Sequence, residues 1–308
     1  MSRSLSGWRA SPRVAVLMAA FEGERWLHAQ VSSILGQVGV SVEIFVSLDP
    51  SRDRSREVLE RMVKDFENIR LLDELPSSGS ACQNFLRLIR DVQTTDFDFV
   101  AFADQDDIWD CDKLSGAIEE METKGTDGFS SSVLAFWSDG RSKLVSKAGR
   151  MHAFNHLFES PGPGCTFVIR PAAIAELRRS LQVDWATFGG VWFHDWLVYA
   201  WVRGSGGTWT ISRQCRMFYR QHDGNVFGAR ASFGDGWARF RTLIDGSYFQ
   251  QVALIDSLVS HEASFFCQLL QRGTLVSRLR LIPALLLVRR RWMDRIAIVV
   301  GVLVGKLR

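Results

Sequence analysis

The chain has 308 residues, of which 46% are hydrophobic and 23% are charged, and its formal net charge is +3. This composition is that of an ordinary globular protein with one large domain or two small ones, and it excludes a fibrous or low-complexity chain. The scattered cysteines include no Cys-x-x-Cys pair, which argues against a disulfide framework or a zinc site and favours a reducing cytoplasm. They are Cys82, Cys111, Cys165, Cys215 and Cys267.

The first half of the chain is predicted to alternate strands and helices. Apolar runs indicate strands at 14–19, 42–48, 69–72 and 97–103. Apolar residues at helical spacing indicate helices between them, at 26–35, 54–66 and 80–92. The basic N terminus imitates a signal peptide, but the helix and the second strand that follow at βαβ spacing favour a first strand over 14–19.

This order predicts an α/β fold with a mostly parallel sheet, right-handed crossovers and flanking helices. Ligands of such sheets bind above the carboxyl ends of the strands. The loops that follow the strands, at 19–22, 48–51 and 104–107, are therefore expected to face one site.

The second half of the chain is less regular. It has candidate strands at 133–137, 166–169 and 208–212, and candidate helices over 171–181 and across the apolar run 197–202. The Gly-rich pieces 161–164 and 204–207 are interpreted as loops, because neither precedes a helix at the spacing of a phosphate-binding fingerprint.

The apolar run 99–103 ends abruptly at three acids, Asp104, Asp106 and Asp107. Carboxylates this close repel one another unless a cation or hydrogen-bond donors neutralise them, and Mg²⁺ or Mn²⁺ favours such oxygen ligands. The alternative is a solvated turn followed by a helix cap, where Asp is also common.

Four motifs, in this order, resemble the inverting glycosyltransferases of family 2, and most of all their rhamnosyltransferase-like branch. They are Val14–Glu24, Phe102–Trp109, His194-Asp195-Trp196 and Tyr219-Arg220-Gln221-His222. The resemblance covers residues 13–228 and implies a GT-A fold over 1–228, with a Rossmann-like sheet, a donor half at about 13–124 and an acceptor half at about 125–228. Residues 229–308 are then a C-terminal helical region.

The resemblance also implies a nucleotide-sugar site with a divalent metal, Mg²⁺ or Mn²⁺. Asp106 is the expected metal ligand, and Asp104 is expected nearer the ribose with a share in the metal site. The metal would act as a Lewis acid that neutralises the departing diphosphate. The other expected donor-binding residues are Ala19, Phe21, Glu22, Asp49, Gln105 and Arg220.

Asp49 matches the acid that contacts the base or ribose in such enzymes, but this chain has Leu48 where the family usually has a second acid. The departure leaves the base preference open between dTDP and UDP donors. A turn residue before Pro50 is the alternative role of Asp49.

Asp195 matches the general base that deprotonates the acceptor hydroxyl, and its alternative is a helix cap. His222 is expected to complete the metal shell or bind the diphosphate, and Arg220 to pair with a phosphate. Both could instead be ordinary surface polar residues. His152 and His156 stand four residues apart without the Glu of a metalloprotease motif, which favours packing roles.

The tail 273–308 holds eight Lys or Arg and one Asp, a net charge of +7, whereas the first 272 residues carry a net −4. Its apolar runs at 282–288 and 296–304 are shorter than the about 20 residues of a spanning helix. A basic, Trp-containing segment of this kind suits an interfacial helix on an anionic membrane. Packing against the body and dimerisation are the alternatives.

The sequence thus predicts a cytoplasmic, metal-dependent glycosyltransferase, peripheral on the inner face of the plasma membrane. Its expected partners are a dTDP- or UDP-linked sugar, with rhamnose suggested by the resemblance, and a glycan or lipid-linked acceptor; no nucleic acid is expected. A catalytically silent nucleotide-sugar-binding or membrane scaffold protein is the main alternative. A nucleotidyltransferase would need a Gly-rich basic loop after the first strand, which residues 19–24 lack.

Overall fold

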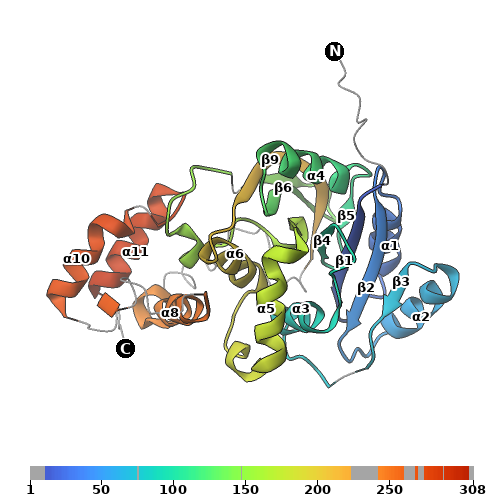
Figure 1. Ribbon diagram of the computed structural model, residues 1–308, viewed down its shortest axis with the longest axis horizontal. Helices are drawn as coiled ribbons and strands as arrows, with labels where there is room; N and C mark the ends of the chain where they lie inside the picture. The colour runs from blue at the N-terminus through green and yellow to red at the C-terminus, as the bar shows by residue number, and fades with distance from the viewer. Residues whose placement is uncertain are drawn as a thin grey trace, which may run out of the picture.

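The computed structural model describes residues 11–74, 76–146, 148–222, 242–259, 268–269, 274–286 and 288–304. These form one curled sheet covered by helices on both faces, with further helices at one end (Figure 1). The predicted boundary at 228/229 lies outside the described residues.

The first half of the sheet is parallel, as predicted. Its strands are β1 (Arg13–Ala20), β2 (Ser41–Leu48), β3 (Ile69–Leu71) and β4 (Phe99–Ala103), in the order β3-β2-β1-β4. The intervening helices are α1 (Leu27–Leu35), α2 (Ser55–Asp65) and α3 (Ala81–Asp91). The Ser80 hydroxyl accepts a hydrogen bond from the N–H of Gln83 and so caps α3, as Ser does at many helix starts.

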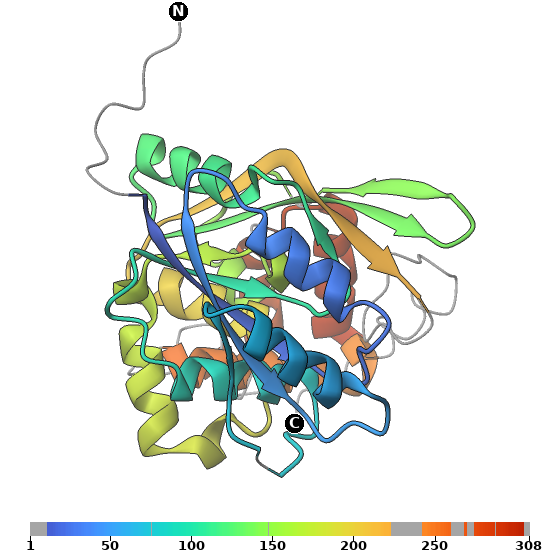
Figure 2. The same ribbon diagram turned by 90° about the vertical axis from the view of Figure 1, so that its right-hand side faces the viewer.

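Side chains of β1 alternate between two hydrophobic clusters, because successive residues of a strand point to opposite faces. Val14, Val16 and Met18 pack in the cluster that holds α1 and α2, which lie on the near face in Figure 2. Leu17 and Ala19 belong to the other cluster, with the apolar residues of α3. The strand is buried on both faces and reads as a continuous apolar run for that reason.

Beyond β4 the sheet becomes mixed. Its further strands are β5 (Ile108–Trp109), β6 (Gly128–Trp137), β7 (Ser142–Val145), β8 (Val168–Ile169) and β9 (Trp209–Gln221), and the order continues β4-β8-β6-β9-β5 with β7 beside β6. The β6–β9 pair is parallel, whereas β8 and β5 pair antiparallel with their neighbours. The parallel arrangement expected from the first half thus extends only partly into the second half.

Helices α4 (Lys113–Lys124), α5 (Pro171–Val183) and α6 (His194–Gly204) cover this second part, together with the 3-10 turns η1 (Asn155–Leu157), η2 (Gly164–Thr166) and η3 (Trp185–Phe188). The helices predicted over 171–181 and across 197–202 are confirmed. The strand predicted over 166–169 is only two residues long, because η2 occupies its start. Strand β9 is much longer than predicted and extends through Tyr219 to Gln221.

The described C-terminal residues form α8 (Ser247–Val259), α10 (Leu275–Leu285) and α11 (Trp292–Val304). Buried residues of these helices join the same hydrophobic cluster as α3, α5 and α6. Arg290 forms an ion pair with the buried Glu159 at 3.2 Å, and Arg289 donates a hydrogen bond to the Tyr248 hydroxyl at 2.9 Å. The tail therefore packs against the body, one of the alternatives weighed from the sequence. Among the described residues, no helix combines the length and the hydropathy needed to cross a membrane.

Candidate functional site

The loops after β1 and β4 are joined by a reciprocal pair of hydrogen bonds. The Phe21 N–H donates to Gln105 Oε1 at 2.7 Å, and Gln105 Nε2 donates to the Phe21 carbonyl oxygen at 2.6 Å. The loop after β2 joins them, because the Glu22 N–H donates to the Ser51 hydroxyl at 3.0 Å. The three predicted loops therefore do meet at one edge of the sheet.

The close approach of these loops constrains the backbone at Glu22 and Gly23. Glu22 has a φ of 48°, an uncommon left-handed conformation for a residue other than glycine. A Cβ atom on Gly23 would lie 2.3 Å from Gln105 Oε1, so only glycine fits there without moving Gln105. Phe21 remains 51% exposed and presents an aromatic ring at the rim of the site.

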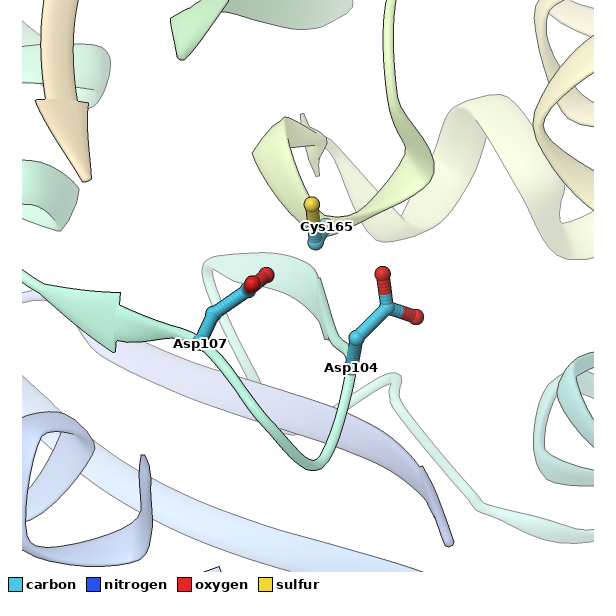
Figure 3. Close-up of side chains that lie close together, drawn as sticks. All are labelled: Asp104, Asp107 and Cys165. Carbon is cyan, nitrogen blue, oxygen red and sulfur yellow. The ribbon is translucent and has the colours of Figure 1, made fainter. Parts of the chain in front are cut away.

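The acidic cluster lies at the end of β4, as the sequence predicted (Figure 3). Side-chain atoms of Asp104, Asp107 and Cys165 all lie within 4.8 Å of one another. Cys165 comes from η2, which lies across from the acidic loop (Figure 3).

Crowding and burial shift the protonation of these groups. Loss of water around the Asp104 carboxyl group, followed by the negative charge of Asp106, raises the pKa of Asp104 to about 7. Asp107 is fully buried, and loss of water, followed by the negative charges of Asp104 and Asp106, raises its pKa well above the usual range for Asp. Burial also lowers the pKa of Lys113 to about 7, against the opposing attraction of Cys165, Asp107 and Asp104. Lys113 Nζ lies 3.3 Å from the centroid of the Trp109 ring.

The end of β9 brings two further predicted residues to the cluster. His222 Nε2 lies 2.7 Å from Asp106 Oδ2, and the His222 ring stacks on Trp26 with centroids 4.2 Å apart. Arg220 donates from Nε to the Asp106 carbonyl oxygen at 2.8 Å and from its backbone N–H to Asp107 Oδ1 at 3.1 Å.

This set of groups fits a divalent cation. Carboxylate oxygens and an imidazole nitrogen are ligands that Mg²⁺ or Mn²⁺ accepts, and a cation would stabilise the ionised form of acids whose pKa burial and crowding raise. Asp106 with His222 offers one pair of ligand atoms, and Asp104 with Asp107 adds carboxylates beside it. The residues thus suit the metal that the sequence suggested.

Asp49 is buried at the end of β2 and is held by donors on two sides. Arg87 of α3 pairs with its Oδ1 at 2.9 Å, and Ser78 donates to the carboxylate from its N–H at 3.1 Å and its hydroxyl at 2.5 Å. The Asp49 N–H donates to the Ala20 carbonyl oxygen, which ties this residue to the end of β1, beside Ala19. The Asp49 carboxylate is thus buried and fixed in place by Arg87 and Ser78.

Asp195 lies in the first turn of α6, but it is not the residue that caps the helix. The N-cap is Phe193, and Asp195 Oδ1 accepts a hydrogen bond from the adjacent Trp196 N–H at 2.7 Å. The charge of Asp195 contributes to the raised pKa of Asp104, so the two carboxyl groups share one electrostatic environment. The preceding His194 stacks on Phe85 at 3.9 Å, and burial lowers its pKa to about 3, so it stays neutral.

Sequence reasoning gave no role to Asp107, Lys113, Cys165, Arg87 or Trp26. The triple acid was a signal for Asp107, but Arg87 gave none, because it lies off the face that Phe85, Leu86 and Ile89 form on the predicted helix 80–92. Lys113 and Cys165 carried no signal of their own, and the fold brings their side chains to the acids.

Comparisons with known proteins give matches to glycosyltransferases. A family model described as "Glycosyltransferase like family 2" matches residues 12–159. The dTDP-rhamnosyl transferase RfbG of Shigella flexneri is 33% identical over 282 residues, which cover 91% of this chain and 97% of that protein.

Two solved structures share the fold. The S. aureus TarS fragment 1–349 in complex with UDP-GlcNAc aligns with a TM-score of 0.57 at 13% identity, over 94% of this chain and 79% of that one. The mannosyltransferase PcManGT of Pyrobaculum calidifontis, in complex with GDP-Man and Mn²⁺, aligns with a TM-score of 0.55 at 12% identity, over 96% and 86% of the two chains.

The raised pKa of Asp104 predicts a pH-dependent response to metal. Because its folded-state pKa of about 7 exceeds the ordinary 3.8, Asp104 contributes stability at low pH that is lost as the pH rises from about 4 through 7. A divalent cation competes with protons for the carboxylates and should restore that stability. We expect the increase in melting temperature with Mn²⁺ to be larger at about pH 8 than at about pH 5, by about 3 °C or more.

Differential scanning fluorimetry with Mn²⁺ or a chelator measures this difference. The variant Asp104→Asn should lose most of the pH dependence, whereas Asp73→Asn, at an exposed position outside the site, should keep it. A metal-induced shift of equal size at both pH values would contradict the prediction.

Proposed function

The chain belongs to glycosyltransferase family 2, and from this premise we propose that it transfers rhamnose from dTDP-rhamnose to a glycan or lipid-linked glycan during surface polysaccharide synthesis. The observation that carries the proposal is the 33% identity to a dTDP-rhamnosyl transferase over a stretch that covers 91% of the chain. TarS and PcManGT, which share the fold, were solved with UDP-GlcNAc and GDP-Man, which supports a nucleotide-sugar donor. A catalytically silent role is not favoured, since the similar full-length protein is itself a transferase.

In this proposal the donor nucleotide binds over the ends of β1, β2 and β4. The base lies near Ala19 and Asp49, where the buried carboxylate of Asp49 can accept a further hydrogen bond, because Arg87 holds its Oδ1 and the Ser78 hydroxyl holds its Oδ2. The exposed ring of Phe21 offers a stacking surface, and the Gln105 clamp fixes its backbone.

The diphosphate lies over the acidic cluster. Arg220 pairs with a phosphate oxygen, since a guanidinium matches phosphate geometry, and Glu22 borders the same pocket. Asp106 and His222 would hold a divalent metal, Mg²⁺ or Mn²⁺, with Asp104 turned toward the donor. When bound, the ion neutralises charge that builds on the departing nucleotide diphosphate.

Asp195 acts as the general base. Its carboxylate accepts the proton of the acceptor hydroxyl while that oxygen attacks the anomeric carbon, and the bond from this carbon to the diphosphate oxygen breaks with its electron pair on the nucleotide. Attack from the face opposite the leaving group inverts the anomeric configuration. One carboxylate suffices because the transition state is oxocarbenium-like and needs little push from the nucleophile.

A lipid-linked acceptor would place this activity at the inner face of the plasma membrane. The protein would then be cytoplasmic and peripheral, in keeping with the positive charge of the tail.

A donor panel tests the proposed substrate. Calorimetric titrations of dTDP-rhamnose, UDP-glucose and GDP-mannose should give the tightest binding for dTDP-rhamnose, and binding should weaken at least about tenfold when a chelator replaces Mn²⁺. The metal requirement follows from the acids that face the diphosphate, which repel it without a cation. Tightest binding of another sugar nucleotide would refute the rhamnose assignment alone, whereas equal affinity with metal and with chelator would refute the metal site.

The base role predicts that Asp195→Asn slows sugar transfer by about 10²–10⁴-fold while donor binding is kept. The substitution removes the proton acceptor but preserves the shape of the side chain. Release of dTDP is measured in single-turnover experiments, with donor affinity measured in parallel. Glu57→Gln is a matched control, because Glu57 is also an acid in the first turn of a helix but lies on α2.

Loss of a helix-terminal charge alone costs about 0.3–1 kcal/mol of stability, so both variants should melt slightly earlier. If Asp195→Asn turned over like wild type, the base would have to be sought elsewhere in the crevice.

A further inference from the structure

The outer face of α11 is apolar although it is exposed. The apolar residues of this face recur at helical spacing, and their exposed fractions lie between 37% and 68%. They are Trp292, Met293, Ile296, Val300 and Val304. The opposite face, with Ile298, Gly301 and Val302, is buried. Packing on the body accounts for that inner face only, and contiguous exposed apolar patches mark surfaces that bind something else.

The neighbouring helix α10 continues this pattern. Val276, Leu279 and Leu286 are between 45% and 60% exposed on its outer side. Arg278 of α10 donates hydrogen bonds to the carbonyl oxygens of Val302 and Leu303, which ties α10 to the end of α11. Both helices lie at the end of the molecule farthest from β3 (Figure 1).

Basic side chains surround the apolar residues. Arg280 is exposed on α10, Arg291 is exposed just before α11, and Arg150 is exposed on the segment next to these helices. Arg295 lies 3.0 Å from His152 Nε2, which brings residues 150–154 against α11. Asp294 is the one acid between residues 273 and 308.

We propose that α10, α11 and residues 150–154 form a docking surface for an anionic lipid bilayer. The proposal deepens the proposed function by naming the surface that would meet a membrane, and it rests on that function only for the lipid-linked nature of the acceptor. The helices lie in the plane of the interface, with the apolar stripe among the acyl chains and the arginines among anionic headgroups. The exposed Trp292 suits such a boundary, since Trp gathers at membrane interfaces.

The charge favours a bilayer over a second copy of the chain. A two-fold contact brings the same patch of both copies together, so it would face arginines with arginines. An anionic leaflet instead complements them.

The docking surface adjoins the helix that carries Asp195. The Trp196 indole N–H donates to the His156 carbonyl oxygen at 3.0 Å, and the Tyr199 hydroxyl donates to Asn155 Oδ1 at 3.1 Å. Residues just after the 150–154 segment thus pack along α6. A membrane on this surface would present a lipid-linked acceptor from the acceptor side of the site.

Vesicle sedimentation of the full chain tests the proposal. Wild type should sediment with phosphatidylcholine vesicles that contain phosphatidylglycerol, and less with phosphatidylcholine alone or at high salt. Trp292→Ser/Ile296→Ser should weaken binding by about tenfold or more. Arg280→Gln/Arg291→Gln should weaken it by about fivefold per charge on the anionic vesicles only.

Matched controls lie elsewhere on the surface. Val183→Ser removes an exposed apolar side chain at the end of α5, and Arg61→Gln removes an exposed charge on α2. Both should sediment like wild type, and melting curves confirm that every variant folds. Variants of the docking surface that sediment like wild type would overturn the proposal. A wild type that stays in solution with both kinds of vesicle would also overturn the proposal. A third contrary outcome is a light-scattering mass that halves in Trp292→Ser/Ile296→Ser while no protein binds vesicles.

Failure of the docking surface and failure of the proposed function give different results. Hydrolysis of dTDP-rhamnose in the absence of vesicles and acceptor should be the same in wild type and in the docking variants. A wild type that binds vesicles but never releases dTDP would contradict the proposed reaction and leave the docking surface standing.

Discussion

Three carboxyl groups at the end of one buried strand are the constraint around which the site is arranged. Burying like charges together is costly unless other groups offset them. The offsetting groups come from two parts of the chain: Lys113 begins α4, six residues after Asp107, whereas Arg220 and His222 lie at the end of β9, more than 100 residues away. The short strand β5 pairs Ile108 with Phe218 and Trp109 with Met217. That register sets Asp106 and Asp107 beside Arg220 and His222, so a two-residue strand fixes this part of the cluster.

The parallel half of the fold could be predicted from the sequence mainly because its two central strands, β1 and β4, are buried on both faces. Such strands read as uninterrupted apolar runs, and helical spacing separates them clearly. The second half offered weaker signals. Strand β5 has two residues and is defined by its partner β9, so no local pattern predicts it, and β8 is only the second half of the strand predicted over 166–169. At Gly128 a Cβ would lie 2.2 Å from the Trp209 ring, so the start of β6 depends on a contact 81 residues away.

The site also contains both residues that local sequence patterns predict and residues that only the folded structure brings together. The residues that follow strands were predictable as a group, because a parallel sheet gathers its carboxyl ends at one edge. Lys113 and Cys165 were not, since their relation to the acids exists only once η2 and α4 are packed. The net charge of the tail overstates the charge that the tail presents to solvent. Of its net +7, Arg289 and Arg290 are directed inward to Tyr248 and Glu159, so only part of the charge faces outward.

Leu48 stands where family 2 enzymes usually have a second acid, and this difference changes the charge at the end of β2. Leu48 is 5% exposed and belongs to the cluster that holds α1 and α2, a place where a second carboxylate would need its own partner. The single acid that remains, Asp49, is matched by one arginine, Arg87, at 2.9 Å. This end of the strand is therefore close to charge-neutral, in contrast to the end of β4. A nucleotide base is itself neutral, whereas a diphosphate is strongly charged. Under the proposed function, the neutral end of β2 suits the base, whereas the acidic end of β4 suits the diphosphate only together with the proposed cation.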